Sequence, residues 1–522
     1  MLKKIWKNEK KDRKLELIGL LGVVSGFLLL TLPTLAKASI WFDEAFSAYL
    51  IRYDFAKIWH FTSVDVHPPL YYFVLKIWSL IFGTSDFGLR SLSVFFGVLT
   101  LIFAFYLIKR IFKSTKTALL SIVMLAISPM FVRYSQEIRM YMMVAFLSIL
   151  TVRAFYEIYL VKNSEKAKKK WRIIFVLSAA AGLWTQYLYG LTIVALWLWR
   201  IWVLRKEFFK NKISFWVKKI FGEKWLVLNI WIVGLFLPWI PFFITQALSV
   251  KSSFWIKDLS FNTIPNYISN FFTFVNSGDL NGWWCLIIFG IVWLLVITVY
   301  RIPKDKKYDF SFLGAMAILP VAVLFLLSLP PFKSIFVDRY ALSGMVFAVL
   351  VLGSLVSSIP KKSKKISIAL FVLVIASFIY GNYEIIRQSG FSKTSNETTE
   401  TRQIIERIKT VAGNDEPIVV TSGYFYYEAA QYSTLQNPVF FTGWNQDYRI
   451  GSLKMLEEDS VHKITDIKEF SKKYSKIWMV YSYGETQKDG LDSSWSLVSQ
   501  ELIKDRLTGN NRYLIQEFSV KK

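Results

Sequence analysis

Long apolar runs recur through residues 16–382, and short segments rich in Lys and Arg separate them. A run of about 20 apolar residues crosses a bilayer as one helix. The pattern therefore predicts an α-helical polytopic membrane protein with about eleven transmembrane helices. Their predicted positions are 16–38, 92–109, 117–133, 140–160, 173–187, 189–204, 225–245, 283–300, 311–330, 341–358 and 366–382.

The basic segments indicate the orientation of these helices. They include residues 3–14, 109–116, 162–172, 205–224, 301–307 and 361–365. Placed on the cytoplasmic side, they satisfy the positive-inside rule and predict an N-terminus inside and a C-terminus outside. The run at 16–38 is long for a signal peptide and is expected to remain as a helix. The net charge of +26 then reflects cytoplasmic loops and does not indicate a nucleic-acid partner.

The external segment 39–91 is aromatic and partly apolar. Its first part, AFSAYLIRYDFAKIWHF, has the spacing of a helix lying in the membrane interface. HPPLYYFVLKIWSLIFG predicts a second interfacial or partly inserted helix, with Pro68 and Pro69 at its start. A spanning helix there would place the later basic loops outside, so the charge pattern argues against it.

The composition changes near residue 384 to that of a soluble domain. Strand-like runs (PIVVTS, PVFFTG, KIWMVYSYG, RYLIQEFSV) alternate with helix-like runs (TRQIIERIKTVAG, DIKEFSKKYS, SSWSLVSQELIKD), and YFYYEAAQYS lies between PIVVTS and PVFFTG. This alternation predicts an extracytoplasmic α/β domain over 384–522 and a transmembrane catalytic domain over 1–383. The C-terminal segment has no Gly-rich phosphate loop, so the sequence does not support a nucleotide site there.

Asp43 and Glu44, in WFDEAFSAYL, directly follow the first apolar run. Unsupported acids at a membrane edge are costly, which favours a functional role. The structural alternative is a pair of acids that stabilises a helix N-terminus. Because neighbouring positions on a helix point about 100° apart, the two carboxylates are expected to differ in role.

Other candidate residues lie at the predicted outer ends of helices. RYSQEIRMY holds Arg133, Glu137, Arg139 and Tyr141, which could form a local ion-pair network or a ligand site. His67 could contact a phosphate or a metal, or cap a helix. Arg339 follows Asp338, which could neutralise it. Gln186 and Tyr187 could line a pocket or face water, and Trp255 could stack on a sugar or anchor the interface. The single cysteine, Cys285, rules out an intramolecular disulfide.

Taken in order, these motifs resemble the GT-C class of polytopic glycosyltransferases, in the group that includes bacterial relatives of protein O-mannosyltransferases and aminoarabinose transferases (glycosyltransferase family 39-like). The resemblance covers about residues 10–350. It rests on the acidic pair, HPPLYY, SDFGLRSLSVFFG, RYSQEIRMY, LPWIPFFITQ and DRYAL. It implies that a sugar moves, with inversion, from a polyprenyl-phosphate carrier to an acceptor on the outer face of the membrane.

The resemblance also assigns roles to residues. Asp43 is expected to be the general base and Glu44 to support it, while His67, Arg139 and Arg339 are expected to bind the donor phosphate. A donor or acceptor pocket is expected to include Glu137, Tyr141, Gln186, Tyr187 and Trp255. Many relatives carry a histidine where this chain has Gln186, which weakens a metal site there. No metal is firmly predicted, although Asp43 and Glu137 could help to hold a divalent ion.

Two other functions fit a polytopic chain with this pattern. A transporter would place charges near the bilayer midplane and often contains internal repeats, whereas the charges here gather at outer helix ends. A lipid-linked glycan ligase or polymerase would share the carrier and differ in the size of the transferred group. We therefore expect a hexosyl- or pentosyltransferase in the plasma membrane, with a protein, lipid or glycan acceptor.

Overall fold

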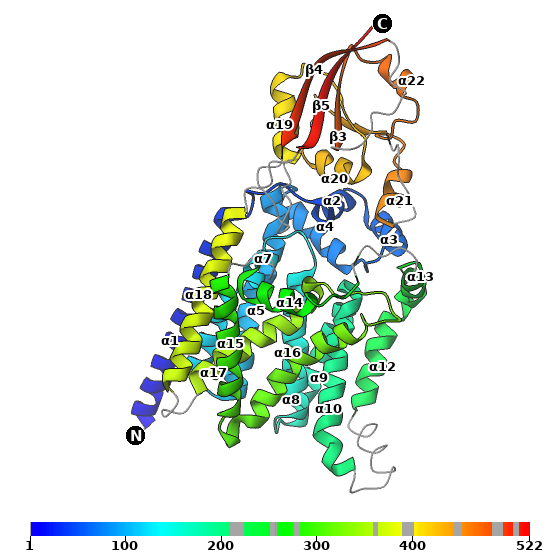
Figure 1. Ribbon diagram of the computed structural model, residues 1–522. Coiled ribbons are helices and arrows are strands. Elements are labelled where there is room, and N and C mark those ends of the chain that lie inside the picture. Colours follow the sequence, from blue (N-terminus) through cyan, green and yellow to red (C-terminus); the bar gives the residue numbers. More distant parts are fainter. Residues whose placement is uncertain are drawn as a thin grey trace. The chain divides into compact units, whose positions relative to one another are not determined.

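The computed structural model describes residues 2–208, 224–250, 256, 258–275, 282–358, 364–388, 401–442, 451–482, 494–504 and 511–521. The chain forms two compact units (Figure 1). The first, here called the membrane unit, comprises Met1–Pro33 and Arg90–Ile386. The second, here called the sheet unit, comprises Thr34–Leu89 and Arg387–Lys522.

The membrane unit is helical. Its helices are α1 (Leu2–Thr31), α5 (Asp86–Phe112), α6 (Thr115–Ala126), α7 (Pro129–Tyr134), α8 (Tyr141–Tyr159), α9 (Glu165–Thr185), α10 (Gly190–Phe208), α12 (Trp225–Phe236), α13 (Ile240–Val250), α14 (Thr263–Thr273), α15 (Gly282–Tyr300), α16 (Lys307–Leu326), α17 (Leu342–Ser358) and α18 (Lys364–Gln388). Short 3-10 turns lie between them: η2 (Tyr187–Tyr189), η3 (Leu237–Trp239), η4 (Lys304–Lys306) and η5 (Asp338–Ala341).

Within the described residues, nine helical segments are long and apolar enough to cross a membrane. They coincide with nine of the eleven predicted spans. The other two predictions fall on α6 and α9. Helix α6 has only 12 residues, and α9 has 21 residues but begins with the charged run EKAKKKWR. Polytopic helical architecture is therefore confirmed. At α6 and α9 the hydrophobic pattern predicted membrane spans, whereas the structure has helices that are too short or too charged to count among the nine.

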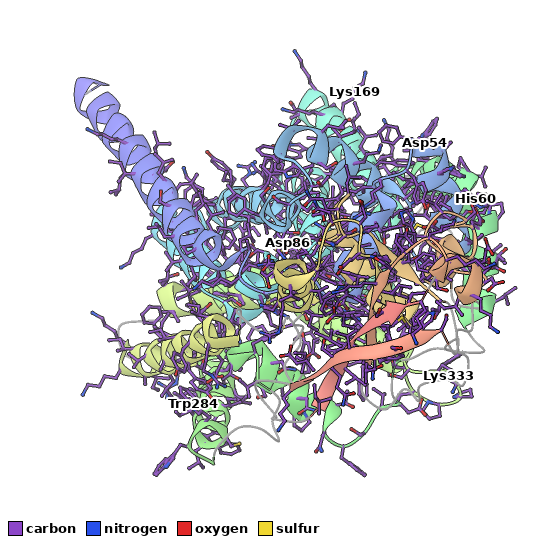
Figure 2. All side chains as sticks on the ribbon, turned by 90° about the horizontal axis from the view of Figure 1, so that it is seen from above. Asp54, His60, Asp86, Lys169, Trp284 and Lys333 are labelled. Carbon is purple, nitrogen blue, oxygen red and sulfur yellow. The ribbon has the colours of Figure 1, made fainter. Side chains whose placement is uncertain are left out.

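The segment 34–89 forms three helices of the sheet unit: α2 (Phe42–Leu50), α3 (Phe55–Val64) and α4 (Leu70–Phe82). The single helix expected over AFSAYLIRYDFAKIWHF is wrong, because the chain breaks between α2 and α3. Asp54 causes the break: its side chain accepts the Lys57 N–H at 2.8 Å and begins α3. Figure 2 labels Asp54 and, on the same helix, His60. Helix α4 is apolar but, at 13 residues, too short to cross a bilayer.

The C-terminal part of the sheet unit is an α/β fold, which confirms the predicted fold class. Its helices are α19 (Thr401–Val411), α20 (Gly423–Gln431), α21 (Gly451–Glu457) and α22 (Ile467–Ser471). Its strands are β1 (Ile418–Val420), β2 (Val439–Phe441), β3 (Lys476–Ser482), β4 (Trp495–Lys504) and β5 (Asn511–Val520). The strand order is β2-β1-β3-β5-β4. Strands β1, β2 and β3 are parallel, and β5 is antiparallel to both β3 and β4.

Strand β4 corrects the helix expected over SSWSLVSQELIKD. Its apolar residues occur as the pairs Leu497–Val498 and Leu502–Ile503, a spacing that also suits a helix. The segment is nevertheless a strand because it pairs along the whole of β5, which satisfies the backbone groups on that side of this edge strand. A core that includes Val419, Met479 and Phe518 packs against Phe470 of α22.

The compact units also group residues differently from the expected domain limits. Residues 34–89 belong with the C-terminal α/β fold by packing, whereas the sequence placed residues 39–91 within a transmembrane domain over 1–383. The expected boundary between residues 383 and 384 stays a prediction about domain organisation. This grouping matters for the candidate site because the acidic pair Asp43-Glu44 lies in the segment 34–89, which is part of the sheet unit.

Candidate functional site

Asp43 and Glu44 occupy the first turn of α2, a helix of nine residues that begins after Trp41. Acids in a first helical turn interact favourably with the helix dipole. The two side chains have different surroundings, as the helical geometry predicts. Glu44 is fully buried at 0% exposure, and Asp43 is partly exposed. Asp43 therefore retains the solvent access that a proton acceptor needs, while the burial of Glu44 suits a supporting role.

His67 lies in the turn before α4 and has a carboxylate beside it. Its Nδ1 is 3.4 Å from Oδ2 of Asp65, and both side chains are largely buried. An acid at this distance helps to fix the orientation of the ring. An imidazole N–H is suited to contact with a phosphate. Asp43, Glu44 and His67 all belong to the sheet unit.

The other predicted residues belong to the membrane unit. Glu137 lies in the turn after α7, where its Oε1 is 3.5 Å from the Arg133 guanidinium; both side chains are buried. Ser93 of α5 donates to the backbone carbonyl of Glu137 and so holds this turn. Arg139, two residues later, is 4% exposed. The local ion-pair interpretation of RYSQEIRMY is therefore correct for Arg133 and Glu137.

Tyr134 is a candidate site residue that sequence reasoning did not single out. Burial raises the pKa of its hydroxyl well above the ordinary value, and the nearby charges of Asp338 and Glu137 raise it further. Arg339 acts in the opposite direction. The Tyr134 and Tyr141 rings lie 5.4 Å apart. The structure thus brings predicted residues Glu137, Tyr141 and Arg339 together around one buried tyrosine.

Asp338 has a specific partner on α14. Asn270 Nδ2 donates to Asp338 Oδ2 at 2.6 Å, and this bond connects η5, which carries Arg339, to α14. Arg339 itself is partly buried. A signal for this cluster was present in the sequence, since Tyr134 and Asp338 are neighbours of the basic residues in RYSQEIRMY and DRYAL. The packing of α14 between those motifs was not visible in the sequence.

Gln186 and Tyr187 sit where α9 ends and η2 begins, and the structure separates their environments. The Tyr187 hydroxyl accepts from Trp239 Nε1 at 2.7 Å and donates to Gln246 Oε1 at 2.6 Å. These bonds give Tyr187 a structural role that links η2 with η3 and α13. Gln186 is 5% exposed, and its Nε2 has no hydrogen-bond partner among the residues that the structure describes. Gln186 therefore has a donor available for a ligand.

Trp255 and a metal site are the two remaining expectations. Trp255 lies outside the described residues. Among the residues that are described, no group of three or more His, Cys, Asp or Glu side chains could hold a metal ion. The suggested metal role of Asp43 and Glu137 thus has no ligand cluster to support it in that part of the chain.

Comparison with known proteins gives a family match over part of the chain and a fold over nearly all of it. Residues 66–221 match the family described as dolichyl-phosphate-mannose-protein mannosyltransferase. No protein with a curated description matches the chain in sequence. The chain is similar to the crystal structure of ArnT from Cupriavidus metallidurans in the apo state, with a TM-score of 0.63 and 11% identity, over 95% of this chain and 97% of that chain. The structure of ArnT bound to undecaprenyl phosphate gives a TM-score of 0.61 at the same identity and coverage.

These similarities confirm the class predicted from the motifs. The chain has the fold of the GT-C polytopic glycosyltransferases over nearly its whole length. The family match adds sequence evidence over a segment that contains His67, Glu137, Arg139, Tyr141, Gln186 and Tyr187. By fold and by this partial family match, the chain is therefore similar to multi-pass membrane glycosyltransferases.

Proposed function

We propose that the protein transfers a sugar from a polyprenyl-phosphate carrier to an acceptor hydroxyl on the outer face of the plasma membrane, with Asp43 as general base. The observation that carries the proposal is the family match over residues 66–221, because it contains most of the residues assigned to the donor. The structure of ArnT with undecaprenyl phosphate supplies the class of carrier. The proposed orientation has the N-terminus in the cytoplasm and the C-terminal α/β fold outside.

The proposed reaction is a single displacement at the anomeric carbon. The acceptor oxygen forms a bond to this carbon as the bond to the carrier phosphate oxygen breaks, so the configuration inverts. The proton of the acceptor hydroxyl passes to the Asp43 carboxylate. The departing phosphate keeps the electron pair of the broken bond, and Arg139, Arg339 and His67 stabilise its charge.

The surroundings of these residues support their roles. Buried arginines suit phosphate binding because a guanidinium is always charged and offers paired N–H donors. Arg139 is buried and Arg339 partly so. Gln186 Nε2 would supply a further donor to a sugar or phosphate oxygen, whereas Glu44 would support α2 from inside the fold. The acceptor is a protein, lipid or glycan hydroxyl.

The Asp43→Asn variant tests the proposal. Purified protein in proteoliposomes would receive a panel of undecaprenyl-phosphate-linked hexoses and pentoses, with membrane extract as the acceptor source, and mass spectrometry would follow released undecaprenyl phosphate. Loss of a general base should slow release by about 10²- to 10⁴-fold. Near-normal turnover by this variant would refute the assignment of Asp43.

Asp54→Asn is the matched control. Asp54 is an exposed acid of the same sheet unit, and asparagine caps a helix as well as aspartate does. The control variant should therefore fold and turn over normally. A comparable loss in both variants would indicate a general effect of removing an acid from this unit.

A further inference from the structure

Helix α2, which carries Asp43, packs on aromatic side chains of the C-terminal α/β fold. The Phe42 and Tyr424 rings lie 4.7 Å apart in an edge-to-face arrangement. Phe46 meets Tyr427 in the same manner at 6.1 Å. Tyr424 and Tyr427 are both on α20, so one helix of the α/β fold covers α2 along its length. Contacts of this kind hold two elements together without fixing the position of one along the other.

A hydrogen-bond chain fixes the C-terminal end of α2. The Tyr49 hydroxyl donates to Asp459 Oδ2 at 2.6 Å. The other Asp459 oxygen, Oδ1, accepts the backbone N–H groups of Val461 and His462, each at 3.0 Å. The His462 ring Nδ1 lies 3.0 Å from Oδ2. Since several groups hold Asp459 in place, it is a rigid acceptor for the Tyr49 proton.

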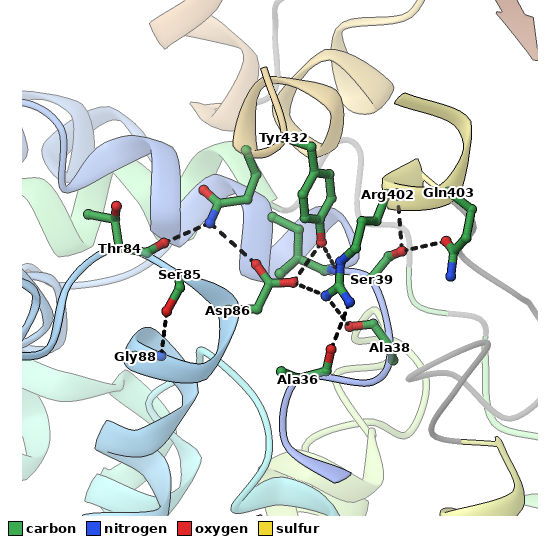
Figure 3. A network of polar contacts seen from close by, with 12 residues as sticks. Ala36, Ala38, Ser39, Thr84, Ser85, Asp86, Gly88, Arg402, Gln403 and Tyr432 are labelled. Carbon is green, nitrogen blue, oxygen red and sulfur yellow. Dashed lines mark hydrogen bonds and ion pairs between the residues drawn. The ribbon is translucent and has the colours of Figure 1, made fainter. Parts of the chain in front are cut away.

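A second set of bonds fixes the chain that enters α2 (Figure 3). The Ile40 N–H donates to the Tyr432 hydroxyl at 2.8 Å, and that hydroxyl donates to Asp86 Oδ2 at 2.8 Å. The Arg402 guanidinium donates to the carbonyls of Ala36 and Ala38 and forms an ion pair with Asp86. Residues of the C-terminal α/β fold therefore hold both ends of α2.

We propose that the C-terminal α/β fold positions the general base, with Tyr49 and Asp459 as positioning residues that act on Asp43 through α2. The inference rests on the proposed function. A helix of nine residues is marginal by itself, so its location depends on the groups that hold it. Tyr49 lies six positions after Asp43, which is about 9 Å along a helix axis at about 1.5 Å per residue. A shift at the Tyr49 end therefore moves the carboxylate of Asp43.

The Tyr49→Phe and Asp459→Asn variants test the inference. The first keeps the ring and removes the bond to Asp459. The second keeps one acceptor oxygen, replaces the other with an NH2 donor and removes the charge. Because a misplacement of about 1 Å can cost about 100-fold in rate, each variant should lower kcat by about 10- to 100-fold. The KM for undecaprenyl-phosphate-linked sugar should not change, because His67, Arg139 and Arg339 are unaltered. A wild-type kcat in both variants would overturn the inference.

Glu517→Gln is the matched control. Glu517 of β5 forms an ion pair with Lys476 of β3 at 2.8 Å. Neither strand takes part in the α2 contacts described above. Its loss weakens the sheet and leaves the two anchors of α2 intact, so kcat should be that of the wild type. Thermal unfolding of each variant shows whether the protein is folded. If kcat falls in proportion to the loss of thermal stability across all three variants, the inference is overturned, because Tyr49 and Asp459 would then have only a general structural role.

A double variant separates this inference from the proposed function. If Tyr49 acts through Asp43, adding Tyr49→Phe to Asp43→Asn should lower the residual rate no further. A further loss equal to that of Tyr49→Phe alone would mean that Tyr49 acts independently of Asp43. Near-normal turnover by Asp43→Asn alone would instead remove the proposed function. An inactive Asp43→Asn together with fully active Tyr49→Phe and Asp459→Asn would remove only the positioning role.

Discussion

Arg133 and Glu137, four positions apart, form an ion pair at 3.5 Å, and only 5% and 4% of their side-chain surfaces are exposed. Breaking a buried pair is costly, because the remaining charge loses its partner and cannot reach water. The Arg133 guanidinium also lies 5.4 Å above the Phe274 ring, which connects the turn after α7 to the end of α14. This pair fixes the segment that carries Arg139.

We predict that Glu137→Gln lowers the free energy of unfolding by about 3 kcal/mol, the cost expected when a buried ion pair loses one of its two charges. The Arg133→Met, Glu137→Met double variant should recover most of that loss, since it removes both charges and fills similar volume. Thermal unfolding in detergent measures both effects. Recovered stability with full carrier release would show that Glu137 is structural only, whereas recovered stability without release would indicate an additional role in the site.

We predict that Arg139→Ala and Arg339→Ala each weaken binding of undecaprenyl phosphate by about 10- to 100-fold, because a hydrogen bond to a charged group contributes about 1.5–3 kcal/mol. Titration of the purified variants with undecaprenyl phosphate checks the result. Arg172→Ala is the control, since Arg172 pairs with Glu165 at 3.1 Å on α9 and has no proposed role in binding. Unchanged affinity in both test variants would identify Arg139 and Arg339 as structural residues.

The sequence predicted the membrane helices well because apolar length is a local property. Nine predicted spans coincide with helices able to cross a bilayer, and the two exceptions have clear causes in the 12-residue length of α6 and the charged start of α9. Two of the three C-terminal helix predictions, at α19 and α22, hold as well. The third, at residues 495–504, failed because pairing with β5 overrides a local apolar spacing that suits a helix equally well.

The candidate site shows the same limit. Asp43, Arg139 and Arg339 were recognised from short motifs, and their roles stay predictions. Tyr134 was overlooked because its importance depends on Asp338 and Arg339, which are about two hundred positions away in sequence and near it in the fold. The Tyr49–Asp459 bond joins residues 410 positions apart. No local pattern in either segment indicates the other.

We predict that Asp459 makes the free energy of unfolding depend on pH in the acidic range. Burial raises the pKa of its carboxyl, but hydrogen bonds from His462 and Tyr49 outweigh burial and hold the pKa well below its ordinary value of 3.8. Because the folded-state pKa is depressed, the contribution is complete above the ordinary pKa and is lost as the pH falls through the folded-state value. The charge of Asp459 in turn raises the pKa values of the nearby Tyr426 and Tyr53 hydroxyls.

Thermal unfolding at a series of pH values, for the wild type and Asp459→Asn, checks this prediction. The difference in unfolding midpoint between the two proteins should be constant between about pH 5 and pH 7. It should shrink below about pH 4, where Asp459 of the unfolded wild-type chain takes up a proton while the folded protein keeps the carboxylate charged. A difference that does not depend on pH down to acid unfolding would contradict the prediction, because it would mean that the charge of Asp459 contributes nothing.

The last prediction concerns the contact between the short helix α6 and α17. Gly353 of α17 lies so close to Ser121 of α6 that a Cβ atom there would be 2.4 Å from the Ser121 Cα. Small residues permit this approach, and the hydroxyls of Ser121 and Ser354 bond across it at 3.1 Å. Since the obstructing atom is backbone, Gly353→Ala must push the helices apart and should cost about 1–3 kcal/mol of unfolding free energy.

Gly314→Ala in α16 is the control, because a Cβ there meets nothing within 4 Å and alanine favours a helix more than glycine does. Thermal unfolding should therefore show a lower midpoint for Gly353→Ala and no loss for Gly314→Ala. Equal midpoints in the two variants would mean that α6 and α17 are not held by this close approach.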